Sequence, residues 1–599
     1  MKLNKYLLSA IAAASLTACS DSPEIVDNNK GHWNADGTGY VSLSISMPDN
    51  VGSKGSRETI NDKFEKGDNN EYVVKNATLV IFSGNTKDSE GDYTLDAAYN
   101  LPLKFQTTNG QQIISKATIT QQINKPSKAK AKALVILNLP SGLSLNDTEH
   151  ELSEVSTTGS TSLKGKSFTY FQNLALTLNT DVANGFTMTN APLTNAYSTA
   201  AGLMPEETAE TKRTTTTLAD IKEGSIKNTP EDAAANKAAD IYVERSVAKV
   251  TVKKGERLKT KISTNTEINC EVMQFALDNT NSTSFLVRNV DNSWAGLVSN
   301  STTVNSLQDK YRFVGFTEVE TGKGYRTYWA KDPNYENKLD NASTSAFSAL
   351  GEDKPLYCME NTFDVAHQTN ANTTRAIVKV QLWKDAADKG KTYYMYNNDA
   401  STFDLQGTKL EENTNLLAAA NKIALVVANN KTVTAFEFED AKDKNGNILK
   451  GYKQIKSVTI DGVKDGTSEI FESIKNYFGN IAVYENGYAY YPVLIKHFGD
   501  GLTPWNKDEY GDATNAPVSS TKIDKIYPGD TNKQDNNYLG RYGVVRNNWY
   551  ELTVNNVKKL GKPGINTPDN TPDDELDSYI SVSINILSWA KRSQDVDLQ

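Results

Sequence analysis

The chain has 599 residues, of which 38% are hydrophobic, 23% are charged and 9% are aromatic, and its 73 acidic and 64 basic side chains give a formal net charge of −9. This composition excludes a collagen, a coiled coil and a wholly disordered chain, and the length predicts two to five domains. The net negative charge argues against a nucleic-acid partner, because such binding depends on neutralising phosphates with a positive face.

The first nineteen residues predict export. Lys2 and Lys5 precede an apolar run from Tyr6 to Leu16, as in a signal peptide, and the run is too short to span a membrane. The sequence from Leu16 to Cys19 resembles a bacterial lipobox, in which the cysteine thiol takes diacylglycerol. We therefore expect lipidation at Cys19, with an ordinary secretory peptide as the alternative, and no later stretch has the roughly 18 apolar residues of a membrane span.

A strand pattern follows this leader. Residues 20–38 are polar and predict a tether, whereas residues 40–47 alternate strictly between apolar and polar side chains. Serines occupy one side, and the other side is apolar: Val41, Leu43, Ile45 and Met47. This alternation predicts a half-buried strand that ends at Pro48. The next twenty or so residues are polar, which favours a flexible segment that a protease could reach.

Further runs of β-forming residues continue along the chain. In the first half they are Tyr72–Ser83, Ile113–Ile119, Ala133–Leu139, Phe168–Leu178 and Ile241–Val252. Between the last two, the stretch from about 205 to 240 is poor in apolar residues and predicts a long surface insertion, partly helical or disordered.

The second half of the chain contains similar runs of β-forming residues. Its predicted strands are Thr373–Leu382, Lys422–Val427, Thr432–Phe438, Tyr488–Ile495, Trp549–Val557 and Tyr579–Leu587. A hairpin with a tight turn is expected at Asp461-Gly462, and a helix is expected between Ser468 as its N-cap and Gly479 as its end. Since strands do not alternate regularly with helices, the fold class is predicted to be all-β, built of antiparallel sandwiches with few short helices.

Sequence signals for chemistry are weak. There is no nucleophile elbow, phosphate-binding loop or paired-histidine metal motif, so we expect no enzyme activity, no metal and no cofactor. A glycosidase with two nearby carboxylates stays open at this point. His497 is expected to be a packed structural residue, and Asp569–Asp577 is expected to be a solvated linker. Cys270 and Cys358 could form one disulfide or stay buried apart.

The C-terminus carries a second alternating strand. Its apolar positions are Ile580, Val582, Ile584 and Ile586, and the same parity continues to Val596 and Leu598. One reading is that both terminal strands are ordinary sandwich strands. The other is donor-strand assembly, in which proteolysis removes the first strand and the last strand of another subunit takes its place.

Several stretches, taken together and in order, resemble a known family. They are Leu16–Cys19, Glu244–Val250, Tyr328–Tyr335, Tyr357–Thr362, Tyr490–Tyr491, Gly543–Tyr550 and the tail from Ser588 to Leu598. They resemble the type V pilins of Bacteroidales, most closely the major (shaft) fimbrillins of the minor, or short, fimbriae.

The resemblance implies two transthyretin-like antiparallel β-sandwich domains. The expected parts are a signal peptide (1–19), a propeptide with the removable strand (20–57), an N-terminal domain (58–257), a C-terminal domain (258–578) and a donor-strand tail (579–599). An Arg-specific, trypsin-like protease is expected to cut between Arg57 and Glu58. Glu58 departs from the small residue that often follows the arginine in this family, so Lys54 and Lys63 remain rival sites.

These features together predict the structural subunit of a pilus that supports adhesion and biofilm formation. Its partners would be identical subunits in a linear polymer, accessory anchor and tip subunits, the protease, and the outer membrane before cleavage. It would begin as a lipidated outer-membrane precursor and end in an extracellular fimbria. Strand Tyr72–Ser83 is expected to border the groove that residues 40–47 vacate. The alternatives are an anchor or tip subunit of the same pilus, or a surface glycan-binding lipoprotein.

Overall fold

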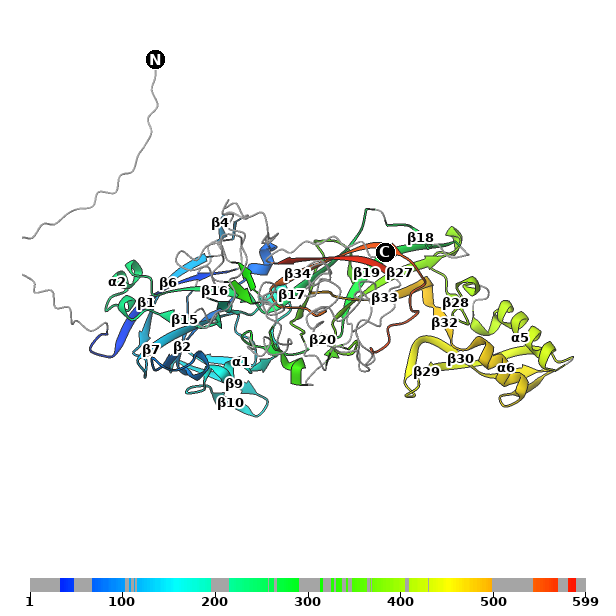
Figure 1. Ribbon diagram of the computed structural model, residues 1–599, viewed down its shortest axis with the longest axis horizontal. Helices are drawn as coiled ribbons and strands as arrows, with labels where there is room; N and C mark the ends of the chain where they lie inside the picture. The colour runs from blue at the N-terminus through cyan, green and yellow to red at the C-terminus, as the bar shows by residue number, and fades with distance from the viewer. Residues whose placement is uncertain are drawn as a thin grey trace, which may run out of the picture.

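A computed structural model describes most of the chain. The described residues are 33–47, 67–102, 107–108, 112–113, 116–194, 215–256, 258–262, 267–289, 313–315, 325–327, 330–336, 341–342, 347–362, 367, 369–404, 409–428, 430–497, 542–568 and 580–588. Their secondary structure is mainly β-strand, which confirms the predicted all-β class. The molecule is elongated, with the first strands at one end and the helices α5 and α6 at the other (Figure 1).

The first strands form one large sheet. Its order is β3 (Thr94–Asn100), β2 (Ala77–Gly84), β7 (Lys130–Leu137), β12 (Met188–Asn190), β16 (Ala239–Arg245), β1 (Thr38–Ser46) and β6 (Lys116–Asn124), and β15 (Ala219–Ile221) also pairs with β7. Strands from opposite ends of this order share one core, as Ile123 of β6 and Tyr99 of β3 do. The Tyr99 hydroxyl also accepts the Asn124 backbone N–H at 2.8 Å. The sheet therefore curls around its own inner face.

The outer face of this sheet has a second core. On β2, Leu79 and Ile81 point inward while Val80 and Phe82 point outward, so the strand is apolar on both sides. The outer core is covered by α1 (Phe168–Gln172) and by a meander of β8 (Leu143–Asn146), β9 (Glu151–Ser156) and β10 (Gly159–Ser162).

Two further sheets pack against each other to form a sandwich. One contains β26 (Leu356–Met359), β17 (Val247–Lys254), β34 (Asn548–Val557) and β35 (Ile580–Ser588). The other contains β18 (Lys261–Ile262), β19 (Ile268–Asp278), β27 (Arg375–Trp383) and β33 (Tyr488–Leu494), with β25 (Ser348–Ala349) beside β19. Apolar side chains from β17 and β34 meet those of β19, β27 and β33 in one core.

The far end of the molecule has its own core. It joins β28 (Tyr393–Met395), β32 (Ile481–Tyr484), β30 (Ile448–Ile460) and β29 (Val433–Lys442) with α5 (Thr414–Val427) and α6 (Glu469–Phe478). The short strand β31 (Val463–Asp465) pairs with β30 outside this core. The α6 prediction is confirmed, since the Ser468 hydroxyl accepts the Phe471 N–H and Gly479 follows the helix. The Asp461-Gly462 turn is confirmed too, with both residues at positive φ.

The remaining elements are short. The strand pairs are β4 (Thr107–Thr108) with β5 (Gln112–Ile113), β11 (Ala175–Leu176) with β21 (Ser284–Phe285), β20 (Thr280–Asn281) with β24 (Asn341–Ala342), and a sheet of β14 (Thr215–Thr216), β13 (Leu193–Thr194), β23 (Tyr325–Thr327) and β22 (Phe313–Gly315). Among the described strands, β1–β16 and β17–β34 pair in parallel, whereas the other named pairs are antiparallel. The division into two sandwich domains stays a prediction.

Two predicted strands are wrong because local helix signals outweigh their β-forming residues. Residues 422–427 end helix α5, whose Leu416, Ala420 and Ala424 lie four residues apart on one buried face. The Asn413 side chain caps this helix by accepting two backbone N–H groups.

In Phe168–Leu178, the first residues form α1 and only Ala175 and Leu176 form a strand. Phe168 and Phe171 both contact the ring of Phe82 edge-on, with centroids 5.5 and 5.1 Å away. Two other boundaries also differ. The strand predicted at 241–252 is two strands separated at Ser246. Of the strand predicted at Tyr72–Ser83, Tyr72 ends the 3-10 helix η1 (Asn69–Tyr72), and β2 begins only at Ala77.

Candidate functional site: the first strand and its surroundings

The first strand lies inside the large sheet and not at its edge. β1 pairs in parallel with β16 over four residue pairs, from Leu43 with Ala239 to Ser46 with Tyr242. It pairs antiparallel with β6 over nine residue pairs, from Thr38 with Asn124 to Ser46 with Lys116. We call the position that β1 occupies between β6 and β16 the β1 slot. The expectation that Tyr72–Ser83 borders this slot is wrong, because β2 pairs with β3 and β7.

The apolar face of β1 is fully buried. Val41, Leu43 and Ile45 have no exposed surface and Met47 is 4% exposed. All four belong to the inner core of the curled sheet, beside Leu79 of β2 and Ile241 of β16. At roughly 1.5–3 kcal/mol for each buried side chain, these four contribute about 6–12 kcal/mol before ordering costs.

The other described strands do not close the sheet without β1. Among the described strands, β6 pairs only with β1, so loss of β1 would leave facing edges on β6 and β16 with unpaired N–H and C=O groups. Unpaired buried backbone groups cost about 1–3 kcal/mol each. An empty slot is thus strongly unfavourable, and another extended segment would restore what is lost.

The last described strand lies at the edge of its sheet. β35 pairs antiparallel with β34, from Ile580 with Val557 to Ser588 with Asn548, and no other described strand pairs with its outer side. Four of the predicted donor residues, Ile580, Val582, Ile584 and Ile586, belong to β35.

The other predicted site residues fall elsewhere. Val596 and Leu598, the lipidation residue Cys19, and the cleavage residues Arg57 and Glu58 with the rivals Lys54 and Lys63 lie outside the described residues. The segment Asp569–Asp577 also lies outside them. The roles predicted for these residues therefore stay predictions.

One stretch of backbone connects the β1 slot with the sheet that contains β34 and β35. β16 borders the β1 slot, and β17 begins two residues after β16 ends and pairs in parallel with β34, the partner of β35. Residues 239–254 therefore pass from the curled sheet to the sandwich. The domain boundary predicted at residue 257 would assign β17 to the first domain, whereas β17 pairs with β26 and β34 of the sandwich.

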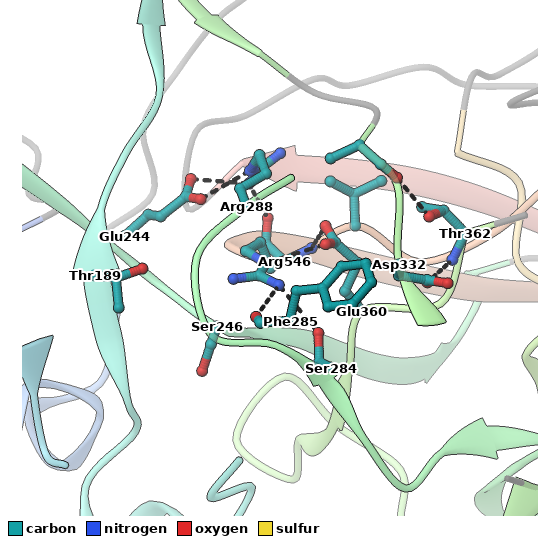
Figure 2. A network of polar contacts seen from close by, with 12 residues as sticks. Thr189, Glu244, Ser246, Ser284, Phe285, Arg288, Asp332, Glu360, Thr362 and Arg546 are labelled. Atoms are coloured by element: carbon teal, nitrogen blue, oxygen red, sulfur yellow. Dashed lines mark hydrogen bonds and ion pairs between the residues drawn. The ribbon is translucent and has the colours of Figure 1, made fainter. Parts of the chain in front are cut away.

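A buried ionic network lies at this passage (Figure 2). Arg288 donates two hydrogen bonds to the carboxylate of Glu244 on β16, at 2.7 and 2.8 Å, and a third to the carbonyl oxygen of Arg546. Arg546 donates to Glu360 at 3.1 Å and to the carbonyl oxygen of Phe285 at 2.8 Å. These two arginines and two glutamates are at most 2% exposed. The network thus links β16 to the residues just before β34 through almost fully buried charges.

A second cluster holds the segment that follows the predicted cleavage region. Lys249 of β17 pairs with Glu71 at 2.7 Å, and the hydroxyl of Tyr357 donates to the same carboxylate at 2.5 Å. Burial and the neighbouring Glu71 raise the pKa of Tyr357. Arg245 lies over the ring of Tyr72 and donates to the Glu71 carbonyl oxygen. Residues 71 and 72 are thereby attached to both β16 and β17.

Asp332 adds a fourth buried carboxylate, after Glu244, Glu360 and Glu71. It accepts backbone N–H groups from Thr362 and Asn334, while burial raises its pKa well above the usual 3.8. Sequence reasoning missed the role of all these residues. One sequence feature could have pointed to them. Each of four residues lies in one of the short stretches that carry the family resemblance: Glu244, Asp332, Glu360 and Arg546.

The remaining sequence candidates have structural roles. His497 is 3% exposed, and its Nδ1 lies 2.7 Å from the hydroxyl of Tyr550, which confirms a packed residue. Cys270 and Cys358 are both unpaired and buried in the sandwich core, and burial raises their thiol pKa values to about 11 and about 12.

The described part of the chain lacks two kinds of feature. It contains no cluster of three or more His, Cys, Asp or Glu side chains arranged to hold a metal. No helix within it has the length and apolar character needed to cross a membrane.

The geometry defines a β-sheet protein in which one inner strand comes from the N-terminal segment and one edge strand comes from the C-terminal segment. Residues 526–595 match the family model of the major fimbrial subunit protein type IV, fimbrillin, C-terminal. The matched range includes Arg546, β34 and β35. This match confirms the resemblance to fimbrillins over the C-terminal part of the chain.

Solved structures give weaker likenesses. A fimbrilin (fimA) from Porphyromonas gingivalis W83 is 14% identical, with 92% of this chain and 99% of that chain covered and a TM-score of 0.32. A putative cell adhesion protein from Parabacteroides distasonis ATCC 8503 is 10% identical, with 93% and 98% covered and a TM-score of 0.32. The tip fimbrial protein Mfa3 from Porphyromonas gingivalis is 12% identical, with 92% and 100% covered and a TM-score of 0.29. TM-scores of this size do not establish a shared fold. No curated protein matches the chain.

Proposed function

We propose that this chain is a structural subunit of a cell-surface fimbria, not an enzyme. It is exported as a lipoprotein through Cys19, cleaved after Arg57, and polymerised when the C-terminal strand of one copy enters the β1 slot of the next. The placement of β1 is the observation that carries this proposal. Cleavage beyond residue 47 separates an inner strand from the rest of its sheet, and the slot then needs a replacement.

The polymer would be held by the same contacts that hold β1. An entering strand gains backbone pairing with β6 and β16 and buries apolar side chains in the inner core. Cleavage after Arg57 would leave the ion pair of Glu71 with Lys249 in place, so the new N-terminal segment stays attached to β16 and β17. Accessory anchor and tip subunits would complete the fibre, and the polymer would be extracellular once the lipidated segment is lost.

N-terminal sequencing of shed fibres tests the maturation step. We expect the subunits to begin at Glu58. A start just after Lys54 or Lys63 would reassign the cleaved residue but would keep the loss of β1. Subunits that begin before residue 38 would retain β1, and this result would overturn the proposal.

A matched pair of core variants tests whether β1 is absent from the fibre. Leu43 of β1 and Leu79 of β2 are both fully buried in the same core, so Leu43→Ala and Leu79→Ala should each destabilise the uncleaved chain by about 2–5 kcal/mol. Only Leu79→Ala should lower the thermal stability of assembled fibres, because Leu43 is removed on cleavage. Urea unfolding of the precursor and thermal dissociation of fibres give the two readouts. Equal weakening of the fibre by both variants would contradict the loss of β1.

A further inference from the structure

The β1 slot is closed on both of its faces. Inward-facing Leu43 has no exposed surface, and outward-facing Ser42 and Ser44 are 0% and 1% exposed. A strand that enters this slot therefore buries its inward side chains in the core. Its side chains at the two outward positions, those of Ser42 and Ser44, must be small enough to fit under the cover.

The outer cover is the segment from residue 222 to 238. It contains η4 (Glu223–Ser225) and α2 (Pro230–Ala235), and α2 contacts β1 and β6. The segment is also held at the edge of β1 that faces β16. There the backbones of Tyr40 and Lys227 exchange two hydrogen bonds of 2.8 and 3.0 Å, and Ala238 donates to the carbonyl oxygen of Ser42. In Figure 1, α2 lies beside β1 and β6 at the end of the molecule.

Small side chains fit best beneath this cover. The hydroxyls of Ser42 and Ser44 are buried and have no hydrogen-bond partner among the described residues, so no polar group lies within hydrogen-bond distance of either serine oxygen. Larger residues would overpack the site at about 1–3 kcal/mol, and an ionised one would lose its hydration. The slot thus accepts an alternating strand with small residues at these two outward positions.

The C-terminal strand repeats this pattern residue for residue. Tyr40-Val-Ser-Leu-Ser-Ile-Ser-Met47 aligns with Tyr579-Ile-Ser-Val-Ser-Ile-Asn-Ile586, and four of the eight positions are identical. Ser581 and Ser583 correspond to Ser42 and Ser44. The later tail does not fit as well, because the outward positions beside Val596 hold Asp595 and Asp597, which the slot would bury as charges.

The position of β35 in its own subunit is compatible with transfer. As an edge strand, β35 leaves by breaking a single ladder, the one with β34. In the slot it would form two ladders, with β6 and with β16. The exchange therefore gains one line of backbone hydrogen bonds for each subunit added.

We propose that residues 579–586 of a second copy of this chain replace residues 40–47 in register, so that Ser581 and Ser583 take the places of Ser42 and Ser44. This inference rests on the proposed function and specifies its partner segment and alignment. The donor runs parallel to β16 and antiparallel to β6, as β1 does. Ser583 therefore lies opposite Thr118, and Ser581 lies opposite Thr120.

Cysteine cross-linking in assembled fibres tests the register. Ser583→Cys combined with Thr118→Cys, and separately Ser581→Cys combined with Thr120→Cys, should give ladders of covalent oligomers on mild oxidation. The mismatched pair Ser583→Cys with Thr120→Cys and the four single variants should give none, since the native Cys270 and Cys358 are buried. A third pair, Val596→Cys with Thr118→Cys, reports on insertion of the later tail.

The outcomes separate this inference from the function on which it rests. Ladders from the two in-register pairs support it. Ladders from the Val596 pair, or fibres without any ladder, overturn the register and leave strand exchange standing. If the cleaved native chain forms no fibres, the proposed function itself fails. Two in-register pairs are used so that poor geometry at one position does not decide the result.

Discussion

Replacing Ile584 with aspartate should abolish fibre formation while the monomer stays folded. In the proposed register Ile584 takes the place of Ile45, which is fully buried in the inner core. The substitution would forfeit roughly 1.5–3 kcal/mol of apolar burial and would also bury a carboxylate at a cost of several kcal/mol. Each subunit added would incur this loss, so long polymers should disappear. Electron microscopy and sizing of the protease-treated chain measure the effect.

The matched control is Ile448→Asp. Ile448 lies on β30 at the far end of the molecule and is 58% exposed, so the same chemical change there should leave assembly intact. Circular dichroism of both monomers checks that they fold. Deletion of residues 579–599 should reproduce the Ile584→Asp result. Normal fibres from either the charged or the truncated variant would exclude the C-terminal strand as the donor.

Removing the Arg546 guanidinium should destabilise the chain by about 3–5 kcal/mol. Arg546→Ala leaves the carboxylate of Glu360 buried and without this partner, and it also removes the hydrogen bonds to Ser284 and Phe285. The cost arises because an uncompensated charge must stay out of water. Since Arg546 and Arg288 connect β34 to β16, the loss falls at the passage between the curled sheet and the sandwich. The urea midpoint of unfolding is the measurement.

Two further variants serve as controls for this prediction. The double variant Arg546→Met with Glu360→Leu removes both charges and should recover most of the lost stability, because apolar replacement of a buried pair is often neutral or favourable. Lys464→Ala breaks an exposed pair with Glu437 and should change stability by no more than about 1 kcal/mol. If Arg546→Ala behaves like Lys464→Ala, the network does not stabilise the passage.

Strand positions were predicted best where alternation was strict and long. The patterns at 40–47 and 579–587 predict β1 and β35, because one apolar side chain in two is a reliable mark of a strand with one core face. Prediction was wrong at 422–427, where a β-branched run ends a helix. The helix signals start earlier in the chain than residues 422–427. They are the Asn413 cap and the four-residue spacing of Leu416, Ala420 and Ala424.

Three features were predictable from the amino-acid sequence: the all-β class, the two similar terminal strands, and the resemblance that residues 526–595 confirm. The packing of the whole chain was needed to show that β1 lies between β6 and β16 and that its serines are buried as well as its apolar residues. It was also needed to show that Arg288 joins Glu244 to Arg546, which pairs with Glu360. The difference arises because alternation along a strand determines only which way its side chains point. Neighbours in a sheet, and charges brought together from positions hundreds of residues apart, depend on how the whole chain packs.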